Sequence, residues 1–114
     1  MEGMSKNTLN NAEMAKAFAA LGHETRLAVY RLLIRAGDDG LNVGQIGDQL
    51  GAAPSTLAHH LSALVDEGWV IQERRGREII NRADYDCMQR TVAFLTEECC
   101  AGLDLTPRED ESAA

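Results

Sequence analysis

Three cysteines are the side chains of this 114-residue chain with the clearest capacity for chemistry. Cys99 and Cys100 are adjacent, and Cys87 precedes Cys99 by 12 positions. Adjacent thiolates suit soft, thiophilic ions and can also take part in redox chemistry. An odd number of cysteines, in a chain whose N-terminus lacks the apolar core of a signal sequence, argues against a disulfide framework. We therefore expect reduced thiols, functional or buried, in a cytoplasmic protein.

A second candidate site is the polar face of a helix that is predicted to start at Pro54 and to end at Gly68. Pro54 suits a first helical turn, and Gly68 suits the left-handed position that often ends a helix. Apolar residues recur at helical spacing and form one stripe, namely Leu57, Leu61, Leu64 and Val65. The opposite face carries short polar side chains: Ser55, Thr56, His59, His60 and Ser62.

The segments around this helix predict a winged helix-turn-helix, which is mainly α with a small β-hairpin. A shorter amphipathic helix is expected over residues 43–50, and Gly51-Ala52-Ala53 joins the two helices. In a helix-turn-helix the second helix enters the major groove of DNA. Residues 70–80 then indicate two short strands around an Arg-Arg-Gly-Arg tip. Such a tip could reach a phosphate backbone.

The net charge of −7 is unusual for a DNA-binding protein, because phosphate contacts need Lys and Arg. The uneven distribution of charged residues along the chain reduces the conflict between the acidic net charge and DNA binding. Residues 70–82 carry four arginines against two glutamates, whereas residues 104–114 carry four acidic side chains against one arginine. An acidic body with a basic tip predicts weak non-specific binding and reliance on specific contacts. The alternative that the acidic charge favours is a protein-interaction adaptor that has this fold but does not bind DNA.

Two further helices are predicted before the helix-turn-helix. The first begins after Asn10 and has an apolar edge at Met14, Ala17, Phe18 and Leu21. The second spans residues 23–35, with Leu27, Tyr30, Leu33 and Ile34 facing inward. Its arginines, Arg26, Arg31 and Arg35, are expected to face outward. Residues 41–43 are expected to add a very short strand beside the hairpin.

A last helix is predicted from Asp84 to about Cys100. Its apolar residues are spaced as in a coiled coil and form a seam of Tyr85, Met88, Val92, Leu95 and Cys99. Such a seam predicts a homodimer through the terminal helices. The alternative is that the helix packs on the first helix of its own chain.

One domain is predicted over residues 10–102. It lies between a disordered N-terminus, residues 1–9, and a disordered acidic tail, residues 103–114. No apolar run approaches the ~18 residues of a membrane-spanning helix, so no membrane partner is expected.

Two runs and the hairpin tip together resemble a known family. The runs are ALGHETRL at residues 20–27 and PSTLAHHLSAL at residues 54–64, followed by Gly68 and the RRGR tip. This combination resembles the ArsR/SmtB (arsenic-repressor) family of dimeric winged-helix repressors, over residues 12–100. In such proteins an inducer releases the repressor from its operator. The resemblance therefore implies double-stranded operator DNA and a second copy of the chain as partners.

Position by position, the resemblance implies which side chains face DNA. Base- and phosphate-facing residues would be Ser55, Thr56, His59 and His60, with Gln45 from the preceding helix. The wing arginines, Arg74, Arg75 and Arg77, would contact the minor groove or the backbone. Adjacent histidines are ~100° apart around a helix, so at least one should face DNA. His60 could instead pack under the hairpin, and each group could also be an ordinary solvated surface.

The side chains available as ligands in this chain indicate which inducer it binds. The family's zinc site on the last helix would fall at Asp84, Asp86, Glu97 and Cys100, where neither of its histidines is present. The pair Cys99-Cys100 resembles the cysteine pair of arsenite-responsive members. This likeness implies trivalent arsenic or antimony (arsenite, antimonite or an organoarsenical) as inducer, without an organic cofactor.

Cys99 and Cys100 can converge on one ion if the last helical turn frays. Cys87 lies ~18 Å from Cys99 along one helix, which is too distant within a subunit. If the final helices cross antiparallel near residue 93, Cys87 of one chain would lie level with Cys99 of the other. A site that uses Cys99 and Cys100 alone is the preferred hypothesis, since a free cysteine such as Cys87 is often simply buried.

A thiol-based redox or reactive-sulfur sensor is the main alternative on the same fold. Reactive thiols usually lie at a helix N-terminus or beside cations. Cys99 and Cys100 are instead expected at a helix C-terminus beside Glu97 and Glu98, which disfavours the thiolate. A metalloid tolerates this better, because it displaces the protons when it binds. An enzyme is not expected, because the sequence has no Gly-rich phosphate loop, nucleophile motif or paired carboxylates.

Overall fold

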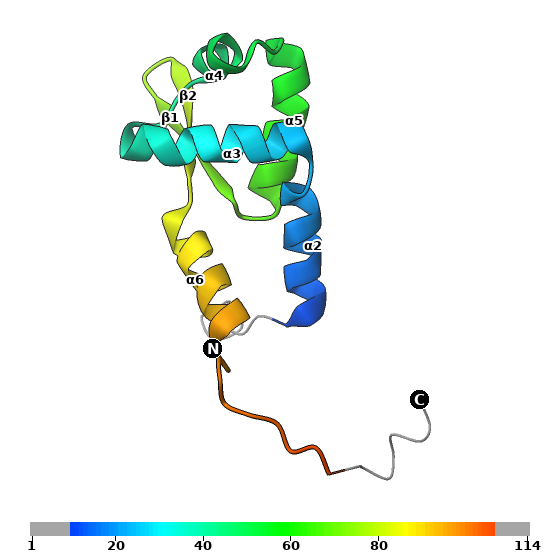
Figure 1. Cartoon of the computed structure of the whole chain (residues 1–114). Coiled ribbons are helices and arrows are strands. Elements are labelled where there is room, and N and C mark those ends of the chain that lie inside the picture. Colours follow the sequence, from blue (N-terminus) through cyan, green and yellow to red (C-terminus); the bar gives the residue numbers. More distant parts are fainter. Residues whose placement is uncertain (1–9, 107–114) are drawn as a thin grey trace.

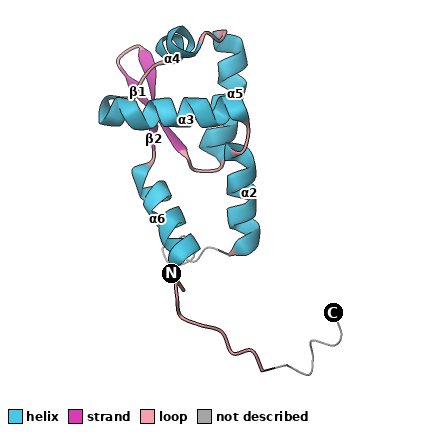
Figure 2. Cartoon of the chain, in the orientation of Figure 1, coloured by secondary structure: helices cyan, strands magenta, loops and turns pink. Residues whose placement is uncertain are grey.

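The computed structural model of the protein describes residues 10–106. In chain order its elements are α2 (Asn11–Leu21), α3 (Glu24–Ala36), a 3-10 turn (Gly37–Asp39), α4 (Val43–Leu50), α5 (Pro54–Asp66), β1 (Val70–Arg75), β2 (Glu78–Ala83) and α6 (Tyr85–Thr96). Figure 1 shows α4 and the hairpin tip on one side of α3, and α2 and α6 extending on the other. Helices dominate around a single β-hairpin (Figure 2), so the predicted winged helix-turn-helix is confirmed.

The described residues include all of these elements but not the chain ends. The predicted disorder of residues 1–9, and of the tail from residue 107 onward, falls outside them. Residues 103–106 form no helix or strand. Among the helices of residues 10–106, none is long and apolar enough to cross a membrane.

Side-chain caps begin the helices at the predicted positions. The Asn10 side chain accepts a hydrogen bond from the Glu13 amide at 2.8 Å, and Asp84 accepts one from the Cys87 amide at 3.2 Å. Each of these bonds satisfies an amide that has no partner within its own helix. Gly68 follows α5 with a φ of +85°, as its predicted role requires.

The core forms where α3, α5 and the hairpin meet around Trp69, which is fully buried. The Tyr30 and Trp69 rings pack in a T-shaped arrangement, with the ring centroids 5.6 Å apart. The Trp69 indole N–H donates to the backbone oxygen of Ala17 at 2.8 Å, which joins the core to α2. The apolar stripe of α5 is confirmed, since Leu57, Leu61 and Leu64 are all buried.

The buried face of α3 differs from the predicted one. Val29, Tyr30 and Leu33 are buried, whereas Leu27 is 44% exposed and Ile34 is 37% exposed. Residues 27 and 34 are two helical turns apart, so both lie on one face of α3, which adjoins the buried face. The prediction that Leu27 and Ile34 face inward is therefore wrong for a single chain. Arg26 is only partly exposed, because it contacts α2 and α5.

The hairpin pairs Val70 with Ala83 at its base and Arg75 with Glu78 at its tip. The short strand expected over residues 41–43 is reduced to one bridge between Leu41 and Asn81, since α4 already begins at Val43. The Asn81 side chain is buried and donates to the Leu41 oxygen at 3.1 Å. These bonds hold the hairpin against the segment that enters the helix-turn-helix.

The last helix is shorter than predicted, because α6 ends at Thr96 rather than near Cys100. Beyond Thr91 every side chain of α6 except that of Phe94 is exposed, so the end of the helix gains little from packing. Glu97 and Glu98 also place negative charge at the C-terminus, where the helix dipole disfavours it. Cys99 and Cys100 therefore lie in a turn after the helix.

Candidate DNA-binding surface and cysteine pair

Close backbone packing fixes the angle between α4 and α5. The Gly51 and Ala52 amides both donate to the Gly47 oxygen, at 2.7 and 3.2 Å. A Cβ on Gly47 would lie 2.7 Å from the Ala52 oxygen, so only glycine permits this approach. Gly51 adopts a left-handed conformation, with a φ of +68°. The turn thus presents α5 at one defined orientation.

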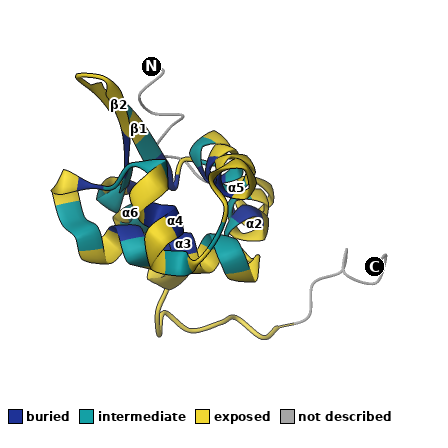
Figure 3. Cartoon of the chain, turned by 90° about the horizontal axis from the view of Figure 1, so that it is seen from above, coloured by how far each residue is buried: buried dark blue, intermediate teal, exposed yellow. Residues whose placement is uncertain are grey.

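The outer face of α5 is exposed as expected for most of its predicted residues. Ser55, Thr56, His59 and Ser62 are all exposed. The hairpin tip is exposed as well (Figure 3). These two surfaces are the parts of the described chain that match the predicted DNA contacts.

His60 has a different environment from His59. Its Nδ1 atom accepts a hydrogen bond from Arg26 Nε at 3.2 Å, and its ring centroid lies 4.7 Å from that of His23. Burial, followed by the nearby His23, Arg26 and His59, lowers the pKa of His60. The imidazole therefore packs against the start of α3 rather than under the hairpin. This geometry does not favour His60 as a base-reading residue.

His23 and Arg26 are the residues of this region whose roles the sequence did not reveal. His23 is the N-cap of α3, and its Nδ1 atom accepts from the Thr25 amide at 3.1 Å. The His23 ring also packs against that of His60, with the centroids 4.7 Å apart. The only available signal was that both residues fall in the ALGHETRL run.

Gln45 lies in the first turn of α4, where it is exposed. Its side-chain oxygen accepts from the Asn42 amide at 2.9 Å, while Asn42 accepts from the Gln45 amide at 2.7 Å. This reciprocal pair is a capping box. The Asn42 amide group also donates to Glu78 of the hairpin at 2.7 Å, which the sequence did not predict.

The three wing arginines have different partners. Arg75 donates to the backbone oxygens of Asp38 and Asp39, each at 3.2 Å, and pairs with Glu73 at 2.6 Å. Arg74 and Arg77 are exposed and form no hydrogen bond or ion pair within residues 10–106. Their guanidinium groups are therefore free for an external phosphate, whereas that of Arg75 is bound to the protein.

The sulfur atoms of Cys99 and Cys100 lie 3.4 Å apart, and both residues are exposed. The turn brings them together because Cys100 has a left-handed backbone with a φ of +62°. The separation is well beyond the ~2.05 Å of a disulfide bond. Both thiols therefore face the same small volume and could bind one thiophilic atom.

Cys87 is buried at the start of α6. Burial, followed by the nearby Asp84, raises the pKa of its thiol. Within the part of the chain that the structure describes, no three or more His, Cys, Asp or Glu side chains form a metal-binding cluster. A site that includes Cys87 would thus need a second subunit and stays a prediction.

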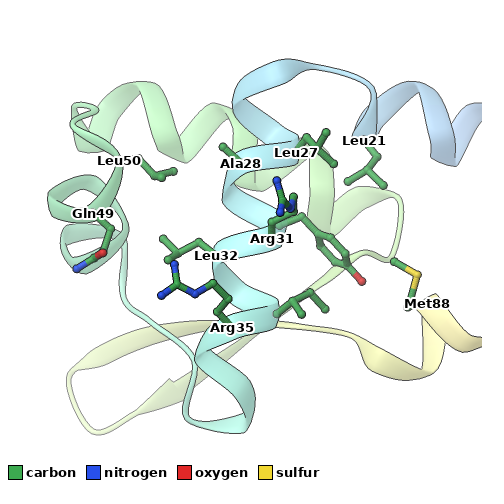
Figure 4. A pocket seen from close by; sticks show the side chains of 11 residues that line it. Leu21, Leu27, Ala28, Arg31, Leu32, Arg35, Gln49, Leu50 and Met88 are labelled. Carbon is green, nitrogen blue, oxygen red and sulfur yellow. The ribbon is translucent and has the colours of Figure 1, made fainter.

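A groove of about 710 Å³ runs along the exposed face of α3 (Figure 4). Leu27 and Ile34 of α3 are among the residues that line it, together with Met88 of α6. Val92 and Leu95 continue this apolar surface along α6 and are 51% and 59% exposed. Within residues 10–106, an apolar strip is therefore uncovered from α3 to the end of α6.

The arrangement of α4, α5 and the hairpin defines a winged helix-turn-helix domain. A family model described as a helix-turn-helix domain matches residues 21–70. No curated protein sequence matches the chain. Among solved structures, an ArsR-like transcriptional regulator from Rhodococcus sp. RHA1 is 32% identical, with a TM-score of 0.68. The match covers 75% of this chain and 78% of the Rhodococcus chain. The chain belongs to the ArsR-like transcriptional regulators.

Two further solved structures resemble the chain. The homodimeric winged helix-turn-helix DNA-binding domain Mb0332 from Mycobacterium bovis is 26% identical, with a TM-score of 0.62. The match covers 76% of this chain and 81% of the Mb0332 chain. The transcriptional repressor BigR from Xylella fastidiosa is 28% identical, covering 87% and 96% of the two chains, with a TM-score of 0.58. BigR is described as a transcriptional repressor, and Mb0332 is described as a possible ArsR-family transcriptional regulator.

Proposed function

We propose that the protein is a homodimeric repressor that leaves its operator when a trivalent metalloid binds Cys99 and Cys100. The observation that carries the inducer assignment is the 3.4 Å separation of the two exposed sulfurs. Trivalent arsenic and antimony are soft and take two or three sulfur ligands. The reduced thiols that this site needs are those of the cytoplasm.

The proposed DNA surface combines α5 with the wing. Ser55, Thr56 and His59 are exposed on α5 and supply hydrogen-bonding groups for bases and phosphates. Gln45 can contribute its amide N–H groups, since its oxygen is used in the capping box. Arg74 and Arg77 would contact phosphates or the minor groove, and Arg75 would instead hold the wing in place.

The proposed dimer buries the apolar strip that runs from the α3 groove along α6. Leu27, Ile34, Val92 and Leu95 are all more than a third exposed in one chain. Monomeric proteins rarely leave such a contiguous apolar surface in water. The homodimeric state of Mb0332, at 26% identity, also supports this proposal. A Leu95→Glu variant should sediment as a monomer where the wild type sediments as a dimer, and an unchanged dimer would contradict the interface.

The function can be tested with a duplex selected by the wild-type protein from a random-sequence library. Arsenite should release the wild type from this duplex, and Cys99→Ser/Cys100→Ser should stay bound. Cys87→Ser is the matched control, since it removes the buried thiol alone. Release of the double variant by arsenite would refute the sensor site, and failure to select any duplex would refute DNA recognition.

Redox or reactive-sulfur sensing remains the second candidate, because two exposed sulfurs at 3.4 Å need only a small movement to form a disulfide or a polysulfide bridge. Peroxide or a persulfide donor would then release the protein from DNA. Full release by arsenite under anaerobic, reducing conditions, with weaker release by peroxide, would favour the metalloid.

A further inference from the structure

Arg26 of α3 forms hydrogen bonds to both α2 and α5, the proposed recognition helix. From the first turn of α3, its Nε donates to His60 Nδ1 on α5 at 3.2 Å. Its Nη1 donates to the Ala20 oxygen near the end of α2 at 3.3 Å. The guanidinium is fixed on both sides, so the bond to His60 constrains how α5 can rotate relative to α3.

The bond to Arg26 also defines the protonation state of the His60 imidazole. An imidazole nitrogen that accepts a hydrogen bond carries no proton, so His60 must be neutral with its proton on Nε2. His23 accepts at Nδ1 in the same way as the N-cap of α3. A second proton on His60 would convert the Nδ1 acceptor into a donor that faces the Arg26 donor.

We propose that Arg26 and His60 are positioning residues that hold α5 in its DNA-binding orientation, and that protonation of His60 breaks this contact. The proposal rests on α5 being the recognition helix of the proposed function. It predicts that acid weakens DNA binding through His60, although added positive charge on the protein would by itself strengthen binding to phosphates.

Among the described residues, the groups that face His60 include no acidic side chain that could balance the charge of a protonated imidazole beside Arg26. Arg26 lies on α3, His23 lies at its N-cap, and His59 adjoins on α5. Among residues 10–106, the contribution of α2 to the hydrogen bonds of Arg26 is the Ala20 carbonyl oxygen. Glu24, also in the first turn of α3, forms no ion pair with Arg26 or His60 among the described residues. Protonated His60 would thus face one permanent cation without an acidic partner.

The test uses asparagine in place of histidine, because Asn Oδ1 occupies nearly the position of Nδ1, accepts a hydrogen bond and does not titrate. In a His59→Asn background, affinity for the selected duplex should fall several-fold from about pH 7.5 to about pH 5.0, because the ordinary imidazole pKa is about 6.5 and that of His60 is lowered. Adding His60→Asn should remove most of this fall. The matched control adds His23→Asn instead, and the fall in affinity should then persist.

Each outcome decides the proposal. Affinity that is flat or rises with acid in the His59→Asn background, or a fall that persists after His60→Asn, would overturn it. Nitrogen NMR of the imidazoles gives a readout without DNA. His60 should be the Nε2–H tautomer at neutral pH, and Arg26→Met should raise its pKa. If no duplex is ever selected, the proposed function fails, while the NMR experiment still tests the contact.

Discussion

Cys99 and Cys100 place their sulfur atoms 3.4 Å apart on an exposed turn that begins after α6 ends at Thr96. In a continuous helix the two side chains would point about 100° apart. The turn removes that divergence, because Cys100 adopts a left-handed backbone. The turn therefore supplies the fraying of the last helical turn that a two-sulfur site requires.

Direct metalloid binding should depend on both members of this pair. Cys99→Ser or Cys100→Ser should each weaken arsenite binding by at least about 100-fold, since a single thiolate cannot chelate. Titration of arsenite against the free thiols measures this effect. Cys87→Ser should bind like the wild type, and a loss of binding in that variant would instead support a site shared between subunits.

Two glycines of α4 should respond oppositely to alanine. Gly47→Ala should destabilise the protein by about 1–3 kcal/mol and weaken DNA binding, because the new Cβ meets the Ala52 oxygen at 2.7 Å. Gly44→Ala meets only the Asn42 side chain at 3.4 Å, so it should be neutral or stabilise by up to about 1 kcal/mol. Urea unfolding of both variants checks the pair, and equal losses would refute the close approach of Gly47 to the Ala52 oxygen as the cause.

Tyr30 should make the protein sensitive to alkali. Burial, then the nearby Cys87, Asp84 and Tyr85, raises the pKa of Tyr30 to about 12. The unfolded chain, with an ordinary pKa of about 10, loses the proton first, so the free energy of unfolding falls as the pH rises above about 10.

The buried Tyr30 hydroxyl has no hydrogen-bond partner among the described residues. Tyr30→Phe should therefore be neutral or stabilising at neutral pH, and it should reduce the alkaline loss. Urea unfolding at pH values from neutral to about 11 measures both effects. Marked destabilisation of Tyr30→Phe at neutral pH would show that the hydroxyl is bonded in solution.

The wing arginines should differ in their salt dependence. Arg77→Gln should lower the slope of log affinity against log salt by about 1, because it removes one phosphate contact. Arg75→Gln should change that slope less, since its guanidinium already binds Asp38, Asp39 and Glu73. Affinities for the selected duplex over a salt series test this, and equal slopes for the two variants would refute the assigned roles.

The sequence by itself determined most of the architecture. Caps at Asn10 and Asp84, a proline at the start of α5 and the glycines at residues 51 and 68 act locally, so their residue types predict where helices begin and end. The apolar period of α5 likewise predicted its buried face. The exposed α5 residues and the exposed cysteine pair could be selected by type and spacing alone.

Tertiary structure decided the features that depend on contacts between distant segments. Leu27 and Ile34 have core-like residue types, yet they stay exposed because no other element of the described chain covers that face of α3. The end of α6 depends largely on the loss of packing partners beyond Thr91, and the charges of Glu97 and Glu98 add a local contribution. His60 binds Arg26, 34 residues earlier in the chain, so its distinction from His59 appears only once α3 and α5 are packed together.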